Sequence, residues 1–276
     1  MTLGRRYKLS AEFYSQKIVV RGGGDLATGV IQKFFRAGFP VVILETSAPN
    51  AIRRSVALCE AVYDGFARVE DMNCRRVSNI DELEDCWQQG EIPLLIDPTG
   101  ETIGQIRPSA VIDAILAKRN LGTHRGMAPI TIALGPGFYA GEDVDVVIET
   151  MRGHDLGRLI FKGCAAPNTG IPGEIGGKSG QRVIHAPACG TVIHKKQIGD
   201  IVQRDEVLFI IEETEARAPF TGLLRGLIRE GAAVPKGMKV ADIDPRTDVD
   251  WRTISDKARC LGGAALEAYF SQNIDN

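Results

Sequence analysis

Residues 17–45 read KIVVRGGGDLATGVIQKFFRAGFPVVILE, and this stretch decides the fold. The run at 17–24 predicts an apolar strand that ends in three glycines. Residues 25–37 predict a helix, because apolar side chains recur at helical spacing and a glycine and a proline follow. Residues 41–45 predict a second strand, whose continuous apolar run suits a parallel sheet covered on both faces. Together they make a βαβ unit.

The turn after the first strand matches the dinucleotide-binding pattern Gly22-x-Gly24-x-x-Ala27. Gly22 permits the tight turn, Gly24 lets a pyrophosphate approach the backbone, and Ala27 lets the helix pack on the strand. The helix N-terminus offers free N–H groups to an anion. Glu45 ends the second strand, where a carboxylate binds a ribose hydroxyl. We therefore predict a site for a nucleotide or another phosphate ester; the alternative is a turn whose glycines serve only packing.

Asp25 complicates this prediction, because its negative charge lies close to the expected phosphate. Its expected role is to cap the helix that starts there. The candidate cofactor-binding turn as a whole comprises Gly22, Gly23, Gly24, Asp25, Leu26 and Ala27.

Further candidates lie where other predicted α/β elements meet the same edge of the sheet. Arg53 and Arg54 fall in a predicted helix over 49–62, where they grip a phosphate or simply face solvent. Asp97 ends the predicted strand over 93–97, where it is a site carboxylate or a turn residue ahead of proline.

The rest of the first half continues the α/β pattern. The predicted elements are helices over 79–89 and 108–119 and strands over 129–134 and 144–149. A polar cluster follows the last strand, and its residues Arg152 and His154 are predicted to line the far wall of the ligand site.

Composition excludes several classes of protein. The chain has 276 residues, of which 44% are apolar and 25% charged, as in a soluble globular protein of about two domains. A net charge of −2 argues against bulk attraction to nucleic acid or to a membrane. No apolar stretch reaches the roughly 18 residues of a membrane helix, and the N-terminal stretch lacks the apolar run of a signal peptide. We therefore expect a cytoplasmic protein.

The cysteines and histidines predict no metal site. The six cysteines include no C-x-x-C pair, and the four histidines show no H-E-x-x-H spacing. We expect reduced thiols, with Cys164 in a Gly-rich loop as the one candidate for a reactive thiol or a soft metal ligand.

The second half contains an internal repeat. Residues 186–208 align without gaps with residues 218–240, at an offset of 32. Each half has the pattern A-P-x-x-G, a β-prone run and G-x-x-V, and neither can bury its apolar face alone. The pattern resembles the two halves of a biotinyl/lipoyl-type barrel-sandwich domain. Carriers of that family hold a modified lysine between the halves, but no lysine lies between Lys196 and Lys236. The resemblance therefore implies a docking or structural domain.

Longer strings extend a resemblance over nearly the whole chain. They are residues 19–65, 133–163, 167–177, DIDPR at 242–246 and ISDKARCLGGAALEAYF at 254–270. These strings are similar to a bacterial family often called YqeB, known as accessory factors of selenium-dependent molybdenum hydroxylase systems. The first half also resembles the Rossmann domain of the XdhC/CoxI maturation factors, which act on molybdenum cofactor before its insertion into xanthine-dehydrogenase-like enzymes.

The expected architecture follows from the patterns and the resemblance together. It is an α/β chain with a Rossmann-like parallel sheet, a small all-β barrel-sandwich domain and a C-terminal helix. The expected division is an N-terminal extension at 1–16, the Rossmann-like domain at 17–165, a Gly-rich linker at 166–180, the barrel-sandwich domain at 181–246 and the C-terminal helix region at 247–276, packing on the α/β domain.

Two functions stay open at this point. The resemblance implies a maturation factor that binds a nucleotide or a molybdopterin-type cofactor at the Gly-rich turn and has a molybdenum hydroxylase as its partner. The alternative is an NAD(P)-dependent oxidoreductase, for which His154 is the only obvious proton donor. A homo-oligomer stays open in either case, and the resemblance supplies no catalytic residues.

Overall fold

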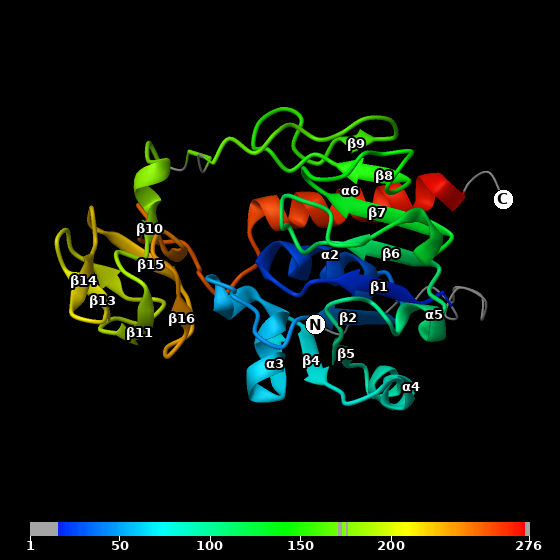
Figure 1. The fold of residues 1–276 in the computed structure, drawn as a ribbon, viewed down its shortest axis with the longest axis horizontal. Coiled ribbons are helices and arrows are strands. Elements are labelled where there is room, and N and C mark those ends of the chain that lie inside the picture. Colours follow the sequence, from blue (N-terminus) through cyan, green and yellow to red (C-terminus); the bar gives the residue numbers. More distant parts are fainter. Residues whose placement is uncertain (1–15, 171–172, 175, 274–276) are drawn as a thin grey trace.

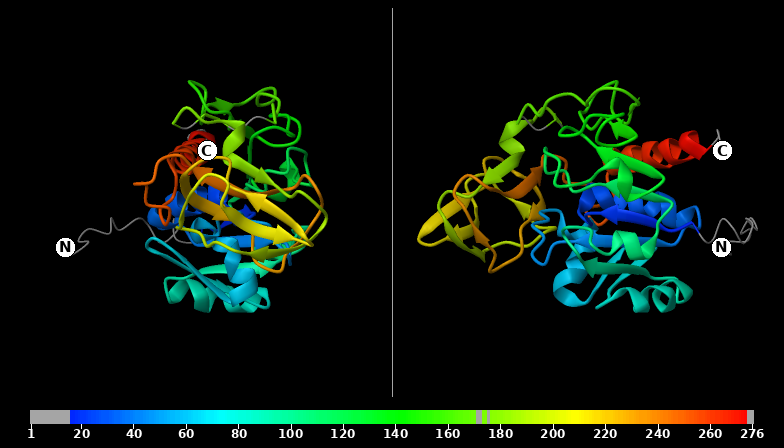
Figure 2. Two further views of the ribbon diagram at one scale, coloured as in Figure 1. Left: turned by 90° about the vertical axis from the view of Figure 1, so that its left-hand side faces the viewer. Right: turned by 45° about the vertical axis from the view of Figure 1, so that its right-hand side comes forward.

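The structure, a computed structural model, describes residues 16–170, 173–174 and 176–273 (Figure 1). Apart from Gln16, the predicted extension at 1–16 lies outside the described residues. The chain forms a mixed α/β part with one large sheet and, at one end of that sheet, a small β part (Figures 1 and 2). The prediction of an α/β chain with a large sheet that contains parallel strands is confirmed.

The large sheet has nine strands in the order β3-β4-β5-β2-β1-β6-β7-β8-β9. All neighbours from β4 to β8 are parallel, and the edge strands β3 and β9 pair antiparallel. The strands are β1 Ile18–Arg21, β2 Val41–Glu45, β3 Phe66–Val69, β4 Met72–Arg76, β5 Ile92–Ile96, β6 Ala110–Asp113, β7 Ile130–Leu134, β8 Val146–Ile148 and β9 Leu159–Ile160.

Helices cover both faces of this sheet. The two long ones, α2 (Asp25–Arg36) and α6 (Asp256–Asn273), share one apolar core with the sheet. The short helices α4 (Leu83–Gln88) and α5 (Ile103–Ile106) bury their apolar side chains against the other face. The remaining helical elements are α3 Ala61–Asp64, η1 Arg54–Val56, η2 Leu58–Glu60, η3 Ile80–Glu82, η4 Arg125–Met127 and η5 Gly180–Arg182.

The two long helices touch backbone to backbone. A Cβ added to Gly262 would lie 2.2 Å from the carbonyl oxygen of Gly29, and one added to Gly29 would lie 2.3 Å from the carbonyl oxygen of Ala258. No side chain fits at either position. Gly262 is thus required for packing, although glycine weakens a helix by itself.

Two predicted helices are wrong. Residues 108–119 form the buried strand β6 and a loop, because a short apolar run fits a buried strand as well as a helix. Residues 49–62 form turns, two short 3₁₀ helices and the start of α3, because this segment bonds to the β part. The carbonyl of Ile52 accepts from the N–H of Leu227 at 2.8 Å, and Nε of Arg54 donates to the carbonyl of Leu227 at 2.8 Å.

The small β part consists of two four-stranded sheets around one apolar core, in the orders β10-β17-β15-β12 and β14-β13-β11-β16. Strands β11, β12 and β13 recur as β15, β16 and β17 at the offset of 32 seen in the repeat. The strands are β10 Val183–His185, β11 Gly190–His194, β12 Ile201–Val202, β13 Val207–Ile211, β14 Thr214–Arg217, β15 Gly222–Leu227, β16 Ala233–Val234 and β17 Lys239–Asp244. In the described part of the chain, no helix has the length and apolarity needed to cross a membrane.

Candidate functional site

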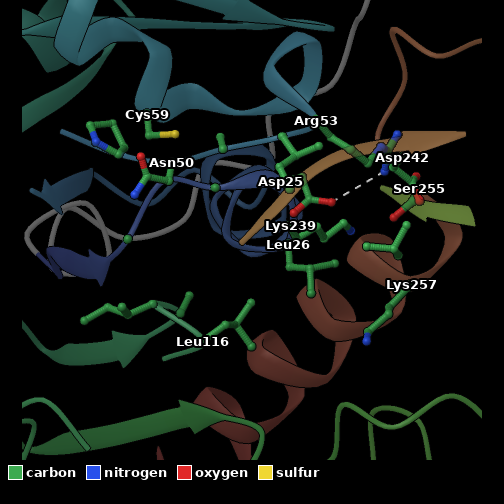
Figure 3. A pocket seen from close by; sticks show the side chains of 18 of the residues that line it. Asp25, Leu26, Asn50, Arg53, Cys59, Leu116, Lys239, Asp242, Ser255 and Lys257 are labelled. Atoms are coloured by element: carbon green, nitrogen blue, oxygen red, sulfur yellow. Dashed lines mark ion pairs between the residues drawn. The ribbon is translucent and has the colours of Figure 1, made fainter. Parts of the chain in front are cut away.

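A cavity of about 550 Å³ lies at the carboxyl ends of β1 and β2, between the N-terminus of α2 and the β part (Figure 3). Carboxyl ends of parallel strands are where open α/β sheets bind ligands. The predicted site residues that line this cavity are Gly22, Gly24, Asp25, Leu26, Glu45, Arg53 and Arg152.

The N-terminus of α2 opens onto the cavity. Gly24 occupies the cap position and no side chain caps the helix, so the predicted capping role of Asp25 is wrong. Asp25 instead lies in the first turn and pairs with Arg53, with Nη1 3.6 Å from Oδ2 (Figure 3). Among the described residues, the N–H groups of Gly24, Asp25 and Leu26 have no hydrogen-bond acceptor. These N–H groups and the positive end of the helix dipole suit an anion.

Glu45 holds the glycine turn in place. Its Oε2 accepts from the N–H of Gly23 at 2.7 Å, and its Oε1 accepts from the N–H of Thr46 at 2.8 Å. Burial raises the pKa of this carboxyl, and the two N–H groups act against that rise. Since each carboxylate oxygen can accept more than one hydrogen bond, Glu45 can fix the turn and still accept a ligand hydroxyl.

Glu45→Gln is expected to lower the free energy of unfolding by about 1–3 kcal/mol. The amide would turn an NH₂ group toward one of the two backbone N–H groups and leave that donor unsatisfied. Urea unfolding measures the loss. The matched control is Glu142→Gln at an exposed glutamate, expected to change stability by less than about 0.5 kcal/mol. Equal stabilities for the two variants would contradict the assigned role.

The opposite walls of the cavity are strongly basic. Arg225 and Lys239 come from β15 and β17, Arg182 from η5, and Lys257 from the first turn of α6. With Arg53 and Arg152 this makes six basic side chains. The acidic side chains of the lining are Asp25, Glu45 and Asp242.

Two of the guanidinium groups keep an unused donor. Nη2 of Arg182 lies 3.2 Å from Asp242, which also accepts from Nη2 of Arg225 at 2.6 Å. The Nε atoms of Arg53 and Arg182 are buried and have no acceptor among the described residues. Burial lowers the pKa of both groups. A buried donor without an acceptor is costly, so these two guanidinium groups destabilise the wall of the cavity.

A second cavity of about 500 Å³ adjoins the first. Its own walls include Leu134 at the end of β7 and Glu149 after β8. Glu149 is occupied structurally, because its carboxylate accepts from the N–H groups of Met151 and Ala166, each at 2.7 Å. The residues that line both cavities are Leu26, Leu116, Arg152, Gly173, Val183, Lys239 and Lys257.

Three predicted residues lie outside the first cavity and have other roles. Arg54 bonds to the β part, as described above. Asp97 holds a turn, since its carboxylate accepts from the N–H groups of Gly100, Glu101 and Thr102. His154 is exposed in a loop and lines neither cavity. None of the three lines this cavity, and a ligand-binding role for them stays a prediction.

The other two serve packing within the turn. Ala27 is fully buried under the sheet. A Cβ on Gly23 would lie 3.0 Å from the backbone nitrogen of Cys59, which donates to the carbonyl of Gly23 at 2.9 Å. Arg152, which does line the cavity, forms a two-bond ion pair with Asp256 at 2.9 Å.

Comparison with curated proteins gives a relative that is 48% identical over 254 residues, which cover 92% of this chain. It is the uncharacterized protein YqeB of Escherichia coli K12. The chain spans about half of that relative, since the match covers 47% of its length. No family model matches the chain.

The solved structures that match this chain are similar to it only at a low level. The ectoine utilization protein EutE (DoeB) of Ruegeria pomeroyi matches with 11% identity and a TM-score of 0.24, over 77% of this chain and 61% of its own. An aspartoacylase family protein of Mesorhizobium loti matches with 12% identity and a TM-score of 0.26, over 83% and 84%. Similarity this low carries no statement about fold or function.

Sequence reasoning missed four of the six basic side chains of the lining. Arg182, Arg225 and Lys239 belong to the β part and Lys257 to the last helix. No local motif marks any of the four.

Proposed function

We propose that this protein binds a nucleotide or a molybdopterin-type cofactor through its phosphates at the turn over 22–26, and that it serves as an accessory factor in the maturation of a molybdenum hydroxylase. One observation supports the binding role most strongly. The cavity combines unpaired N–H groups of a helix N-terminus with six basic side chains in its walls. Both features favour an anionic oxygen.

The order of the parallel strands supports the Rossmann-like assignment. The run β5-β2-β1-β6-β7-β8 corresponds to the order 3-2-1-4-5-6 of dinucleotide-binding sheets. In such sheets the ligand binds where the order reverses, which is between β1 and β6. The cavity is lined by Gly22 after β1 and by Ala114 after β6.

The repeat supports the barrel-sandwich assignment of the β part. Equivalent strands recur at one offset, and the two halves interleave, because β11 pairs with β16 of the other half and β15 pairs with β12. The segment between the halves carries no lysine, so a swinging arm is not part of the proposal. The β part instead closes one side of the cavity.

The site favours holding a ligand over reacting with it. Cys59 is the thiol in the lining, and burial raises its pKa well above the ordinary value. A neutral thiol is a poor nucleophile. The maturation role and the xanthine-dehydrogenase-like partner rest on the family resemblance. The oxidoreductase alternative loses its proposed proton donor, since His154 lies outside both cavities.

A thermal-shift panel with NAD, NADP, ATP, CTP and a molybdopterin dinucleotide tests the proposal. A ligand at about 100 times its Kd adds roughly 2.7 kcal/mol, which moves the Tm of a chain of this size by several degrees. We expect a response to the molybdopterin dinucleotide or to its nucleotide component. A response confined to NAD or NADP would favour the oxidoreductase, and no response from any ligand would contradict the binding role.

A further inference from the structure

We infer that the ligand carries a second anionic group besides the phosphate at α2, and that Lys239, Lys257 and Arg182 bind this group. The inference rests on the proposed function and adds the class of ligand, which is a diphosphate or another doubly anionic ester. It also makes the β part half of the binding site.

The two lysines come from different parts of the chain and line the same cavity. Lys239 begins β17 and Lys257 lies in the first turn of α6, yet both line the first cavity (Figure 3). Both also line the second cavity. Neither ammonium group has a hydrogen-bond or ion-pair partner among the described residues. Lysine ammonium groups suit phosphate oxygens as point charges.

Lys257 is in an unfavourable place without an anion. A cation in the first turn of a helix opposes the helix dipole, and the neighbouring guanidinium of Arg152 repels it. Burial and Arg152 lower the pKa of this amine, while Asp25, Glu149 and Asp256 act in the opposite direction. A bound phosphate would offset both penalties.

The carboxylate groups near these lysines already have hydrogen-bond donors as partners. Asp256 forms two bonds to Arg152, and both oxygens of Glu149 accept backbone N–H groups. Asp242 is shared by Arg182 and Arg225. The chain therefore supplies no free carboxylate for the two ammonium groups.

Arg182 adds a fixed positive charge to the same cavity. Its side chain is only 5% exposed, and its Nη atoms bond to Asp242 and to the carbonyl of Gly173. These bonds hold the guanidinium in the wall of the cavity that the two lysines also line.

Titration calorimetry with inorganic phosphate and pyrophosphate tests the inference on the full chain. Lys239→Gln and Lys257→Gln are each expected to weaken pyrophosphate binding by about 10-fold, the value of one charge-assisted bond. Phosphate binding should change by less than about 2-fold, because one phosphate occupies the α2 site alone. Lys236→Gln, at an exposed lysine outside both cavities, controls for general loss of positive charge and should bind both anions normally.

The outcomes separate this inference from the proposed function. Lysine variants that bind pyrophosphate normally, or that lose phosphate and pyrophosphate equally, would overturn the second anion site. Gly24→Asp that binds both anions with the affinity and stoichiometry of the wild type would overturn the α2 site and the proposed function. A wild-type chain that binds neither anion would overturn both.

Discussion

Gly24→Asp is expected to lower the affinity for a phosphate-bearing ligand by at least about 100-fold. A Cβ on Gly24 meets no atom within 4 Å, and the residue has an ordinary φ of −66°, so the chain accepts a side chain here. The new carboxylate would project from the helix cap, where the ligand phosphate is expected. Two like charges in close contact cost several kcal/mol. Titration calorimetry or the thermal-shift response measures the loss.

The same substitution should not unfold the protein. Aspartate is among the best N-cap residues and stabilises a helix relative to an uncapped start, so the free energy of unfolding should stay equal or rise. Gly24→Asn is the matched control, because it has nearly the same shape and capping ability without the charge. Its side chain can accept the helix N–H groups that a phosphate would use, so we expect it to weaken binding, but at least about 10-fold less than Asp. If Asn and Asp weaken binding equally, the effect comes from capping or shape and the charge argument is wrong.

Gly262→Ala is expected to lower the free energy of unfolding by about 2–3 kcal/mol. The added methyl group would lie 2.2 Å from the carbonyl oxygen of Gly29, so α2 and α6 must move apart. The better helix propensity of alanine returns only about 1 kcal/mol. For a chain of this size the Tm should fall by roughly 5–10 °C, as measured by calorimetry.

Gly263→Ala is the matched control for that experiment. It lies in the same helix, but a Cβ there meets no atom within 4 Å. Alanine should therefore raise stability by about 0.5–1 kcal/mol. A Gly262→Ala variant as stable as Gly263→Ala would show that the two helices do not pack as described.

The sequence predicted the parts of the fold that local pattern determines. The apolar runs of β1 and β2 and the periodicity of α2 are complete within residues 17–45, and the structure places these elements within a few residues of the predicted bounds. The prediction of a helix over 108–119 failed. Its first residues form a buried strand, and a short apolar run fits a strand as well as a helix. Pairing with the neighbouring strands β1 and β7 makes this segment a strand.

For the candidate site, too, local sequence pattern identified some residues and missed those that only the tertiary fold brings in. The glycine turn and Glu45 were found because spacing alone indicates them. Lys239 and Lys257 were missed, because only the tertiary fold brings them to the N-terminus of α2. Asp97 was left with two roles, and the structure shows the turn role: its carboxylate accepts from the N–H groups of residues 100–102. Sequence offers no means to tell these roles apart.

Amide hydrogen exchange with and without saturating inorganic pyrophosphate tests the central claim most directly, because the unpaired N–H groups at 24–26 are the proposed anion contacts. The account predicts slower exchange in the peptide that spans 22–28 and in those that contain Arg182, Lys239 and Lys257, with little change in the peptide that contains His154. Binding that leaves exchange at 22–28 unchanged would contradict it.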